Sequence, residues 1–306
     1  MGAEQAASEA SAARYALDPG DRVLVVGGTR GEAGPTPPVG GAAWTEVTTT
    51  HGDPADRPGA SADVVLVVEP FRPADPVRAI SELHRVLAPG GRLAVVGPAN
   101  GSGSPWREPL RRSALFTPLA SVRVPGASGE PAAEVAWAER RGPATPGRDG
   151  IVAFVHTSPG GVPKRPVQGA WVHRLGVDGD GHVYSGHGGD DAAVCLLAQE
   201  AIARVRADGH ALFPGAVGEN VTVLGIDWAA LRVRDRLVFG SGLELELTDY
   251  ATPCQTIAHW FTRRRIARIG QKKHPEDARW YARVLAEGVL EPGDTIRHEP
   301  AAASAS

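Results

Sequence analysis

The sequence predicts a two-domain protein in which an N-terminal α/β domain with a mainly parallel sheet precedes a β-rich C-terminal domain. A chain of 306 residues is long enough for two domains. Its first third contains uninterrupted apolar runs, which are typical of parallel strands buried on both faces. Its second half contains short strand-like runs separated by loops rich in glycine and proline. The composition changes near residues 142–147, and this change places the predicted domains at 1–147 and 148–306.

Composition limits the classes of function. The formal net charge is -3, so the chain lacks the basic field that nucleic-acid binding uses, and we expect no nucleic-acid partner. No apolar run approaches the roughly 18 residues that span a bilayer, and no secretory signal is recognisable, so we expect no membrane partner. The two cysteines, Cys195 and Cys254, cannot make a disulfide framework, which favours a reducing, cytoplasmic location.

The first domain is expected to contain three buried strands and one helix. The strands are predicted at residues 22–26, 62–68 and 92–96, and a further short strand at 44–49. Asp75 and Pro76 open a helix that continues to about Leu87, because apolar residues recur there at helical spacing. Residues 99–149 either complete the sheet or form a linker.

These segments resemble the class I S-adenosylmethionine methyltransferases. Residues 23–31 resemble the glycine-rich first motif of that family, Gly52 and Asp53 resemble its adenine loop, and residues 84–93 resemble the segment before its fifth strand. The resemblance implies a Rossmann-like fold. The stretch before Asp63 is about twenty residues too short for a complete βαβ unit, and the strand that ends in an acidic ribose-binding residue has no counterpart. We therefore expect a truncated methyltransferase-like domain with a scaffold role rather than bound S-adenosylmethionine.

Cys254 is the residue of the second half that is best placed for chemistry. It follows an alternating apolar run at 243–247, which predicts a half-buried strand. Pro253 restricts its own backbone and that of Thr252, so the strand is expected to end there and to present the thiol on a turn. An exposed thiol in that position suits a nucleophile or a metal ligand. The alternative is a small buried apolar side chain.

The remaining second-half segments are strands at 151–156, 168–173, 221–223 and 235–239 and a helix at 192–207. Cys195 falls on the apolar face of this predicted helix and is expected in the core. No pair of histidines has zinc-ligand spacing on one helix, so no zinc site is expected. Residues 259–274 are strongly basic; they form either a solvated helix face or an anion-attracting wall that lowers the pKa of Cys254.

Several loops, together with Cys254, resemble the MOSC family, named for the sulfurase C-terminal domain associated with the molybdenum cofactor. The matching loops occur in the family's order at 160–164, 176–180, 187–189, 214–220 and 252–254. The resemblance implies a β-barrel with flanking helices, and it is strongest to the bacterial stand-alone type linked to detoxification of N-hydroxylated bases.

The resemblance also implies a molybdopterin-type cofactor whose molybdenum is ligated by Cys254. A thiolate suits this metal, and a pterin phosphate calls for a lysine, hydroxyl groups and backbone amides in glycine-rich loops. His187 and Lys164 could instead be a turn residue and a surface charge. The expected cofactor-binding residues are Thr157, Ser158, Lys164, His187, Gly188, Gly189, Asn220 and Thr252.

Four functions follow from these patterns. The first is a molybdenum-dependent oxidoreductase that reduces a small N-hydroxylated or related N–O substrate with an external electron donor protein. The second is a sulfurtransferase in which Cys254 carries a persulfide received from a sulfur donor. The others are methyl transfer by the first domain and a non-catalytic carrier of the cofactor.

Overall fold

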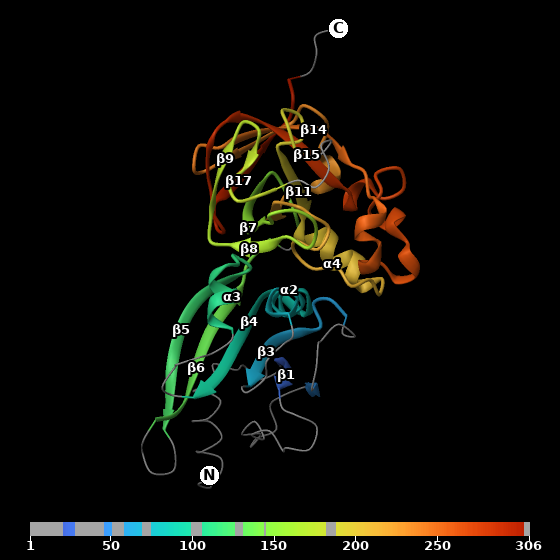
Figure 1. The fold of residues 1–306 in the computed structure, drawn as a ribbon. Helices are drawn as coiled ribbons and strands as arrows, with labels where there is room; N and C mark the ends of the chain where they lie inside the picture. Colours follow the sequence, from blue (N-terminus) through green and yellow to red (C-terminus); the bar gives the residue numbers. More distant parts are fainter. Residues whose placement is uncertain are drawn as a thin grey trace. The chain divides into compact units, whose positions relative to one another are not determined.

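The protein is described from a computed structural model that covers residues 21–27, 46–50, 58–68, 75–98, 106–125, 131–143, 145–181 and 188–302. The chain divides into two compact units, each built around its own sheet (Figure 1). The first unit comprises Met1–Pro109 and Phe116–Arg141, and the second comprises Leu110–Leu115 and Gly142–Ser306. None of the helices within the covered ranges combines the length and the apolar character that crossing a bilayer requires.

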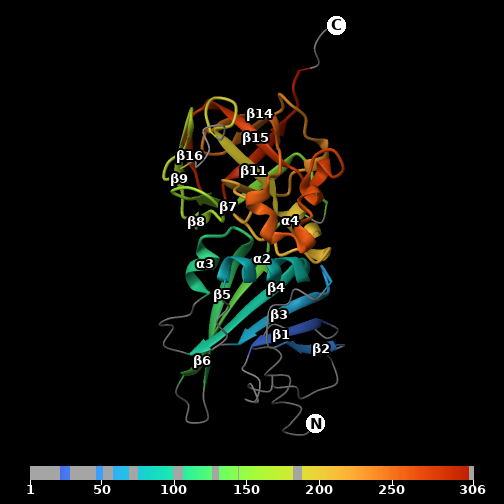
Figure 2. The ribbon, with the colours of Figure 1, turned by 45° about the vertical axis from the view of Figure 1, so that its right-hand side comes forward.

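The first unit contains a six-stranded sheet in the order β2-β1-β3-β4-β6-β5 (Figure 2). Strands β1 to β4 pair in parallel, whereas β6 runs antiparallel to β4 and to β5. The α/β class predicted for this region is confirmed. The elements are β1 (Arg22–Gly27), β2 (Glu46–Thr50), β3 (Ala62–Val68), α2 (Pro76–Val86), β4 (Leu87–Pro98), α3 (Arg107–Arg111), β5 (Phe116–Pro125) and β6 (Pro131–Arg140).

The helix α2 begins where the sequence predicts. The Asp75 carboxylate accepts hydrogen bonds from the backbone N–H groups of Val77 and Arg78, at 3.0 and 3.1 Å, and so caps the helix. Pro76 occupies the first turn, where its missing N–H costs nothing. Ile80 and Leu83 are buried, as the helical spacing of the apolar residues predicts.

Three details of this sheet differ from or extend the prediction. Residues 88–91, expected to stop the helix, belong to β4, whose pairing with β3 is irregular between the Ala62–Leu87 and Val64–Arg92 pairs. The short strand predicted at 44–49 is present as β2 beside β1, and it ends in Thr50 rather than in an acidic residue. Residues 116–140 complete the sheet as β5 and β6 and are therefore not a linker. The glycine-rich turn after Gly27 and the Gly52–Asp53 loop lie outside the described residues.

The second unit is a closed barrel of seven strands in the order β12-β11-β15-β14-β13-β17-β7, which closes through the pairing of β12 with β7. β8 pairs antiparallel with β7 and is not one of the seven barrel strands. A separate three-stranded sheet has the order β10-β9-β16. This confirms the predicted β-barrel with flanking helices. The strands are β7 (Asp149–Thr157), β8 (Arg165–Val167), β9 (Ala170–His173), β10 (Gly176–Val177), β11 (Val194–Ala198), β12 (Val221–Leu224), β13 (Arg236–Phe239), β14 (Glu244–Ala251), β15 (Arg279–Ala286), β16 (Gly288–Leu290) and β17 (Thr295–Glu299).

Helical segments of the second unit lie outside the barrel wall. They are α4 (Gln199–Ala207) and the 3-10 turns η2 (Trp228–Ala230), η3 (Gln255–Trp260), η4 (Thr262–Arg264), η5 (Ile266–Ile269) and η6 (Pro275–Asp277). The basic segment predicted as a helix face is therefore a series of short 3-10 turns. Its sequence lacks the sustained apolar periodicity that stabilises a longer helix.

The helix predicted at 192–207 is wrong in its first part. Residues 194–198 form β11, and only the residues from Gln199 onward are helical. All five residues of β11 are buried, and the strand pairs with β12 and β15 in the barrel wall. A short continuous apolar run is compatible with both helix and buried strand, and here the pairing with two neighbouring strands decides.

Candidate functional site

Cys254 lies on the turn that follows β14. Leu245 and Leu247 of β14 point into the core, and the strand ends at Ala251, whose partner on β15 is Arg279. Thr252 and Pro253 then separate the strand from the 3-10 turn η3, of which Cys254 is the N-cap residue. The Cys254 side chain is exposed, so the predicted strand end and thiol-bearing turn are both confirmed.

The environment of Cys254 favours its thiolate. Partial burial alone would raise its pKa, but hydrogen bonds to Thr256, a backbone hydrogen bond to Ile257 and the positive charge of Arg279 hold the pKa below the ordinary value of a cysteine. Of the basic residues considered from the sequence, Arg268 is bound instead to Asp208 and Asp277. The cation that acts on the thiol comes from β15 rather than from the basic segment.

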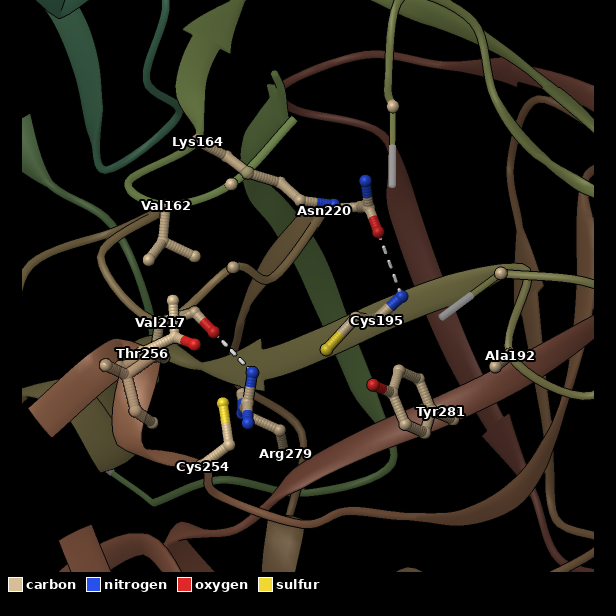
Figure 3. A pocket seen from close by; sticks show the side chains of 15 residues that line it. Val162, Lys164, Ala192, Cys195, Val217, Asn220, Cys254, Thr256, Arg279 and Tyr281 are labelled. Atoms are coloured by element: carbon tan, nitrogen blue, oxygen red, sulfur yellow. Dashed lines mark hydrogen bonds between the residues drawn. The ribbon is translucent and has the colours of Figure 1, made fainter. Parts of the chain in front are cut away.

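The thiol opens onto a cavity of about 260 Å³ (Figure 3). Four residues expected from the sequence line it, namely Lys164, Gly188, Asn220 and Cys254. Other lining residues that the later argument uses are Val162, Cys195, Val217, Gly218, Thr256, Arg279 and Tyr281.

Asp180 organises the polar wall of the pocket. Its carboxylate accepts hydrogen bonds from Lys164 Nζ at 2.5 Å, Asn220 Nδ2 at 2.8 Å and the Ser158 backbone N–H at 3.0 Å. Asn220 Oδ1 in turn accepts from the Cys195 backbone N–H at 3.1 Å. The sequence reasoning passed over Asp180 as a site residue, although it ends the 176–180 motif that supports the family resemblance.

The other predicted cofactor-binding residues lie outside the set that lines the cavity. The Ser158 hydroxyl donates to the Gly160 carbonyl at 2.9 Å and accepts from the Gly160 N–H at 3.1 Å, so it stabilises its own loop. Thr157 is half-buried at the end of β7, and Gly189 and Thr252 are exposed. His187 lies outside the described residues.

Arg279 is a site residue that the sequence reasoning missed. Its guanidinium group is buried and donates to the Val217 carbonyl through Nη1 and to the Thr252 carbonyl through Nη2, the latter at 3.4 Å. Its Nε is buried and has no hydrogen-bond partner among the described residues. The sequence around Arg279, the first residue of β15, carries no local signal for such a role, because only the barrel pairing brings it beside the Cys254 turn.

Cys195 is buried, as expected from the sequence, and it also lines the pocket. It lies on β11 opposite Tyr281 of β15, and its sulfur points toward the cavity (Figure 3). The side chain is 5% exposed. Burial raises the pKa of the Cys195 thiol, and Arg279 and Lys164 oppose this only in part. Burial also raises the pKa of Tyr281, to about 12, so its phenol keeps its proton at neutral pH.

Glu219 stabilises the loop at 214–220, three of whose residues (Val217, Gly218 and Asn220) line the pocket. Its Oε1 accepts from the Gly215 N–H at 2.6 Å, which closes the loop on itself. The residue is fully buried, and burial raises the pKa of its carboxyl group. This hydrogen bond makes Glu219 a capping residue of its own loop.

Comparison with known proteins gives a family match within the second unit. Residues 183–297 match the family model described as the MOSC domain, which agrees with the resemblance stated from the sequence. No curated protein matches the chain.

Solved structures that resemble parts of the chain fall into two groups. The YUAD protein from Bacillus subtilis covers 50% of this chain and 97% of its own, with 16% identity and a TM-score of 0.43. YiiM from Geobacillus stearothermophilus covers 51% of this chain and 78% of its own, with 24% identity and a TM-score of 0.40. A SAM-dependent methyltransferase from Aquifex aeolicus covers 44% of this chain and 89% of its own, with 17% identity and a TM-score of 0.33.

Proposed function

We propose that this protein is a molybdenum-cofactor-dependent oxidoreductase that reduces an N-hydroxylated or related N–O substrate, with Cys254 Sγ as the protein ligand to the metal. The observation that supports it is the exposed, thiolate-favouring Cys254 at a pocket whose wall contains the buried cation Arg279. Together with the MOSC domain at 183–297, this arrangement suits a soft metal held by sulfur.

The residues present fit such a group. Cys254 would supply the sulfur ligand. Arg279, whose buried Nε has no hydrogen-bond partner in the described part of the chain, would supply positive charge to an anionic portion. The cavity of about 260 Å³ is smaller than the roughly 300–1,000 Å³ of pockets that enclose a complete ligand, so it suits one end of the cofactor. When bound, the cofactor supplies the two-electron chemistry.

The chain's own groups prepare the site. Arg279 stabilises the negative charge on Cys254 Sγ, so the thiol is poised to bind as thiolate. Tyr281 keeps its phenolic proton because its pKa is about 12, and its O–H can donate a hydrogen bond to a substrate oxygen. Lys164 Nζ is held by Asp180, so its charge acts at a fixed place in the pocket wall.

Metal analysis of protein produced in a host that makes the cofactor tests the proposal. We expect molybdenum to co-purify with the wild-type protein near one atom per chain and to be lost in Cys254→Ser. Cys195→Ala is the matched control, because it removes the other thiol of the pocket and should retain the metal. A metal-free wild-type protein with no reduction of any N-hydroxylated base would overturn the proposal.

Sulfur transfer is a second candidate, favoured by the same exposed thiol with a lowered pKa. In this function Cys254 would carry a persulfide. Incubation of the reduced protein with a polysulfide, followed by mass spectrometry, should then place one extra sulfur on Cys254. A protein that stays unmodified under these conditions excludes this route.

We assign the first unit a scaffold role. β2 ends in Thr50, so it lacks the acidic residue that the methyltransferase resemblance calls for at the cofactor ribose. Isothermal calorimetry with S-adenosylmethionine should show no binding. Saturable binding would contradict the scaffold role and would support methyl transfer by the first unit.

A further inference from the structure

The basic segment, residues 259–274, follows closely after Cys254 in the chain. It contains six arginines and lysines and no aspartate or glutamate, although the whole chain has a formal net charge of -3. Its 3-10 turns lie together on one side of the second unit, beside α4 (orange in Figures 1 and 2). The segment is therefore a local excess of positive charge in an acidic protein.

Five of the six cations are exposed and have no carboxylate within ion-pair distance in the described part of the chain. Arg268 is the sixth, and it is bound to Asp208 and Asp277. Other exposed arginines of the second unit, such as Arg174 and Arg283, do have carboxylate partners. The segment thus presents charge that the chain does not neutralise. The five residues, which we call the cationic surface, are Arg263, Arg264, Arg265, Lys272 and Lys273.

The cationic surface lies on a base that is fixed to the barrel. Phe261 and Ile269 of the same segment are buried in the core of the second unit. The Thr262 hydroxyl donates to the Gly209 carbonyl at 2.6 Å, and the Thr262 N–H donates to His210 Nδ1 at 3.0 Å. The cations are therefore carried by an anchored stretch of backbone rather than by a free tail.

The cationic surface adjoins the turn that borders the pocket. Arg264 Nη2 donates a hydrogen bond to Gln255 Oε1 at 3.3 Å, and Gln255 directly follows Cys254. The next two residues, Thr256 and Ile257, line the pocket. A partner seated on the cationic surface is therefore brought against the turn that carries Cys254.

The other side chains of the segment narrow the class of partner. Phe261 is buried, and Trp260 packs edge-on against Phe213 with ring centroids 4.9 Å apart, so neither offers a stacking surface to a single-stranded nucleic acid. None of the large apolar side chains that are exposed within the described ranges belongs to the segment, so it lacks the apolar face of a membrane-surface helix. Exposed cations without such neighbours match an acidic protein face.

We propose that the cationic surface docks a protein electron donor through an acidic face around the donor's redox group. The proposal rests on the proposed function, because reduction of one N–OH group to N–H and water consumes two electrons and two protons. The donor is oxidised by these two electrons, and the protons come from solvent. Charge attraction at the cationic surface speeds the encounter and places the donor beside the Cys254 turn.

Binding of a flavodoxin, an acidic flavin-containing electron carrier, tests the docking without any turnover. The metal-free full-length protein is titrated with oxidised flavodoxin by calorimetry at about 20 mM salt, where surface charges are weakly screened. A triple variant that removes three cations of the surface should bind about tenfold more weakly, or worse. A matched triple variant that removes three exposed arginines elsewhere in the second unit should bind as the wild type does. The substitutions are Arg263→Gln, Lys272→Gln and Lys273→Gln in the first variant and Arg148→Gln, Arg165→Gln and Arg297→Gln in the second.

Carbodiimide cross-linking gives a readout that needs no variant to fold. The reagent joins a carboxylate to a lysine amine where the two are in contact. Lys272 and Lys273 are two of the three lysines of the chain, and the third, Lys164, is buried. Peptide mapping of the wild-type complex should place flavodoxin peptides on Lys272 or Lys273. Wild-type protein that gives no such cross-link, that binds no better than the first triple variant, or that prefers single-stranded DNA or phosphatidylserine vesicles to flavodoxin would overturn the proposal.

Turnover of the cofactor-loaded protein separates this proposal from the proposed function. With reduced methyl viologen, a small cationic donor that needs no docking site, the wild type and the first triple variant should reduce an N-hydroxylated base at equal rates. With reduced flavodoxin, the variant should be slower by about tenfold or more. Equal flavodoxin rates would overturn the docking. Absence of turnover with either donor would overturn the proposed function instead, and binding and cross-linking would then decide the docking.

Discussion

Lys164 Nζ and Asp180 Oδ2 lie 2.5 Å apart, and both side chains are nearly enclosed by protein. The same carboxylate accepts from Asn220 and from the Ser158 backbone. Asp180 thus joins the loop after β7 to the loop that carries Asn220. Asn220 Oδ1 also accepts a hydrogen bond from the backbone N–H of Cys195, so the Lys164–Asp180 ion pair is connected through Asn220 to the strand that carries Cys195.

Asp180→Ala is expected to lower the free energy of unfolding of the second unit by about 3–5 kcal/mol, because it leaves the buried Lys164 without its counter-ion. Asp178→Ala is the matched control. Asp178 lies two residues away and pairs with His173, but both side chains are about half exposed, so the loss should be within about 1 kcal/mol. Urea unfolding of the two variants measures the difference. Equal losses would show that the enclosed pair contributes no more than a surface pair.

Gly218 lies at the pocket with a φ of +88°, and a Cβ added there would come within 3.0 Å of Val162 Cγ1. Gly218→Ala is therefore expected to combine left-handed backbone strain of about 1–2 kcal/mol with steric displacement of Val162. Gly209→Ala isolates the backbone term, because Gly209 has a similar φ of +84° but open space around it. Chemical denaturation should rank Gly218→Ala below Gly209→Ala in stability. The reverse order would contradict a closely packed pocket wall.

The sequence is sufficient to predict those features of the fold and the site that depend on a few neighbouring residues. Alternation in β14 followed by Pro253 is sufficient to place Cys254 on an exposed turn, and Asp75 with Pro76 is sufficient to start α2. The approach of Arg279 and Tyr281 to this turn could not be predicted in the same way, because it depends on which strands become neighbours in the barrel.

The position of Cys195 on a strand that lines the pocket could not be predicted from the local sequence either. A five-residue apolar run satisfies both a helix face and a buried strand, and only pairing with β12 and β15 distinguishes them. Asp180 was missed for a different reason. Its position in a glycine-rich motif was visible, but its partners Lys164 and Asn220 are 16 and 40 residues away.

Arg279 is expected to control the reactivity of Cys254. Replacing it with glutamine removes a positive charge that helps to lower the Cys254 pKa, so the thiolate fraction at neutral pH should fall. We expect alkylation of Cys254 by iodoacetamide at pH 7 to slow by roughly 2–10-fold, and Arg279→Lys to restore part of the rate. Arg283→Gln, which removes an exposed arginine of the same strand, is the control and should leave the rate unchanged. The pH dependence of alkylation in a Cys195→Ala background gives the pKa directly. An unchanged Cys254 pKa in Arg279→Gln would show that Arg279 does not lower the pKa of this thiol.

His156 is fully buried, and neither ring nitrogen has a hydrogen-bond partner among the described residues. Burial, together with the charge of Lys164, lowers its pKa from about 6.5 to about 3. Between these two values the unfolded chain binds the imidazole proton and the folded protein does not. The contribution of His156 to the free energy of unfolding should therefore be fully present above pH 6.5. It should be lost as the pH falls toward 3, by up to about 1.4 kcal/mol per pH unit.

His156→Phe removes the titrating group while keeping an aromatic ring that can stack on Phe154. Phenylalanine is larger than histidine, so the absolute stability can change through overpacking. The test is therefore the pH dependence of the free energy of unfolding. Measured by urea titration from pH 7 to pH 4, this free energy should fall less steeply in His156→Phe than in the wild type. Parallel slopes for His156→Phe and the wild type would mean that the buried imidazole is protonated in the folded protein, although neither ring nitrogen has a partner among the residues that the structure describes.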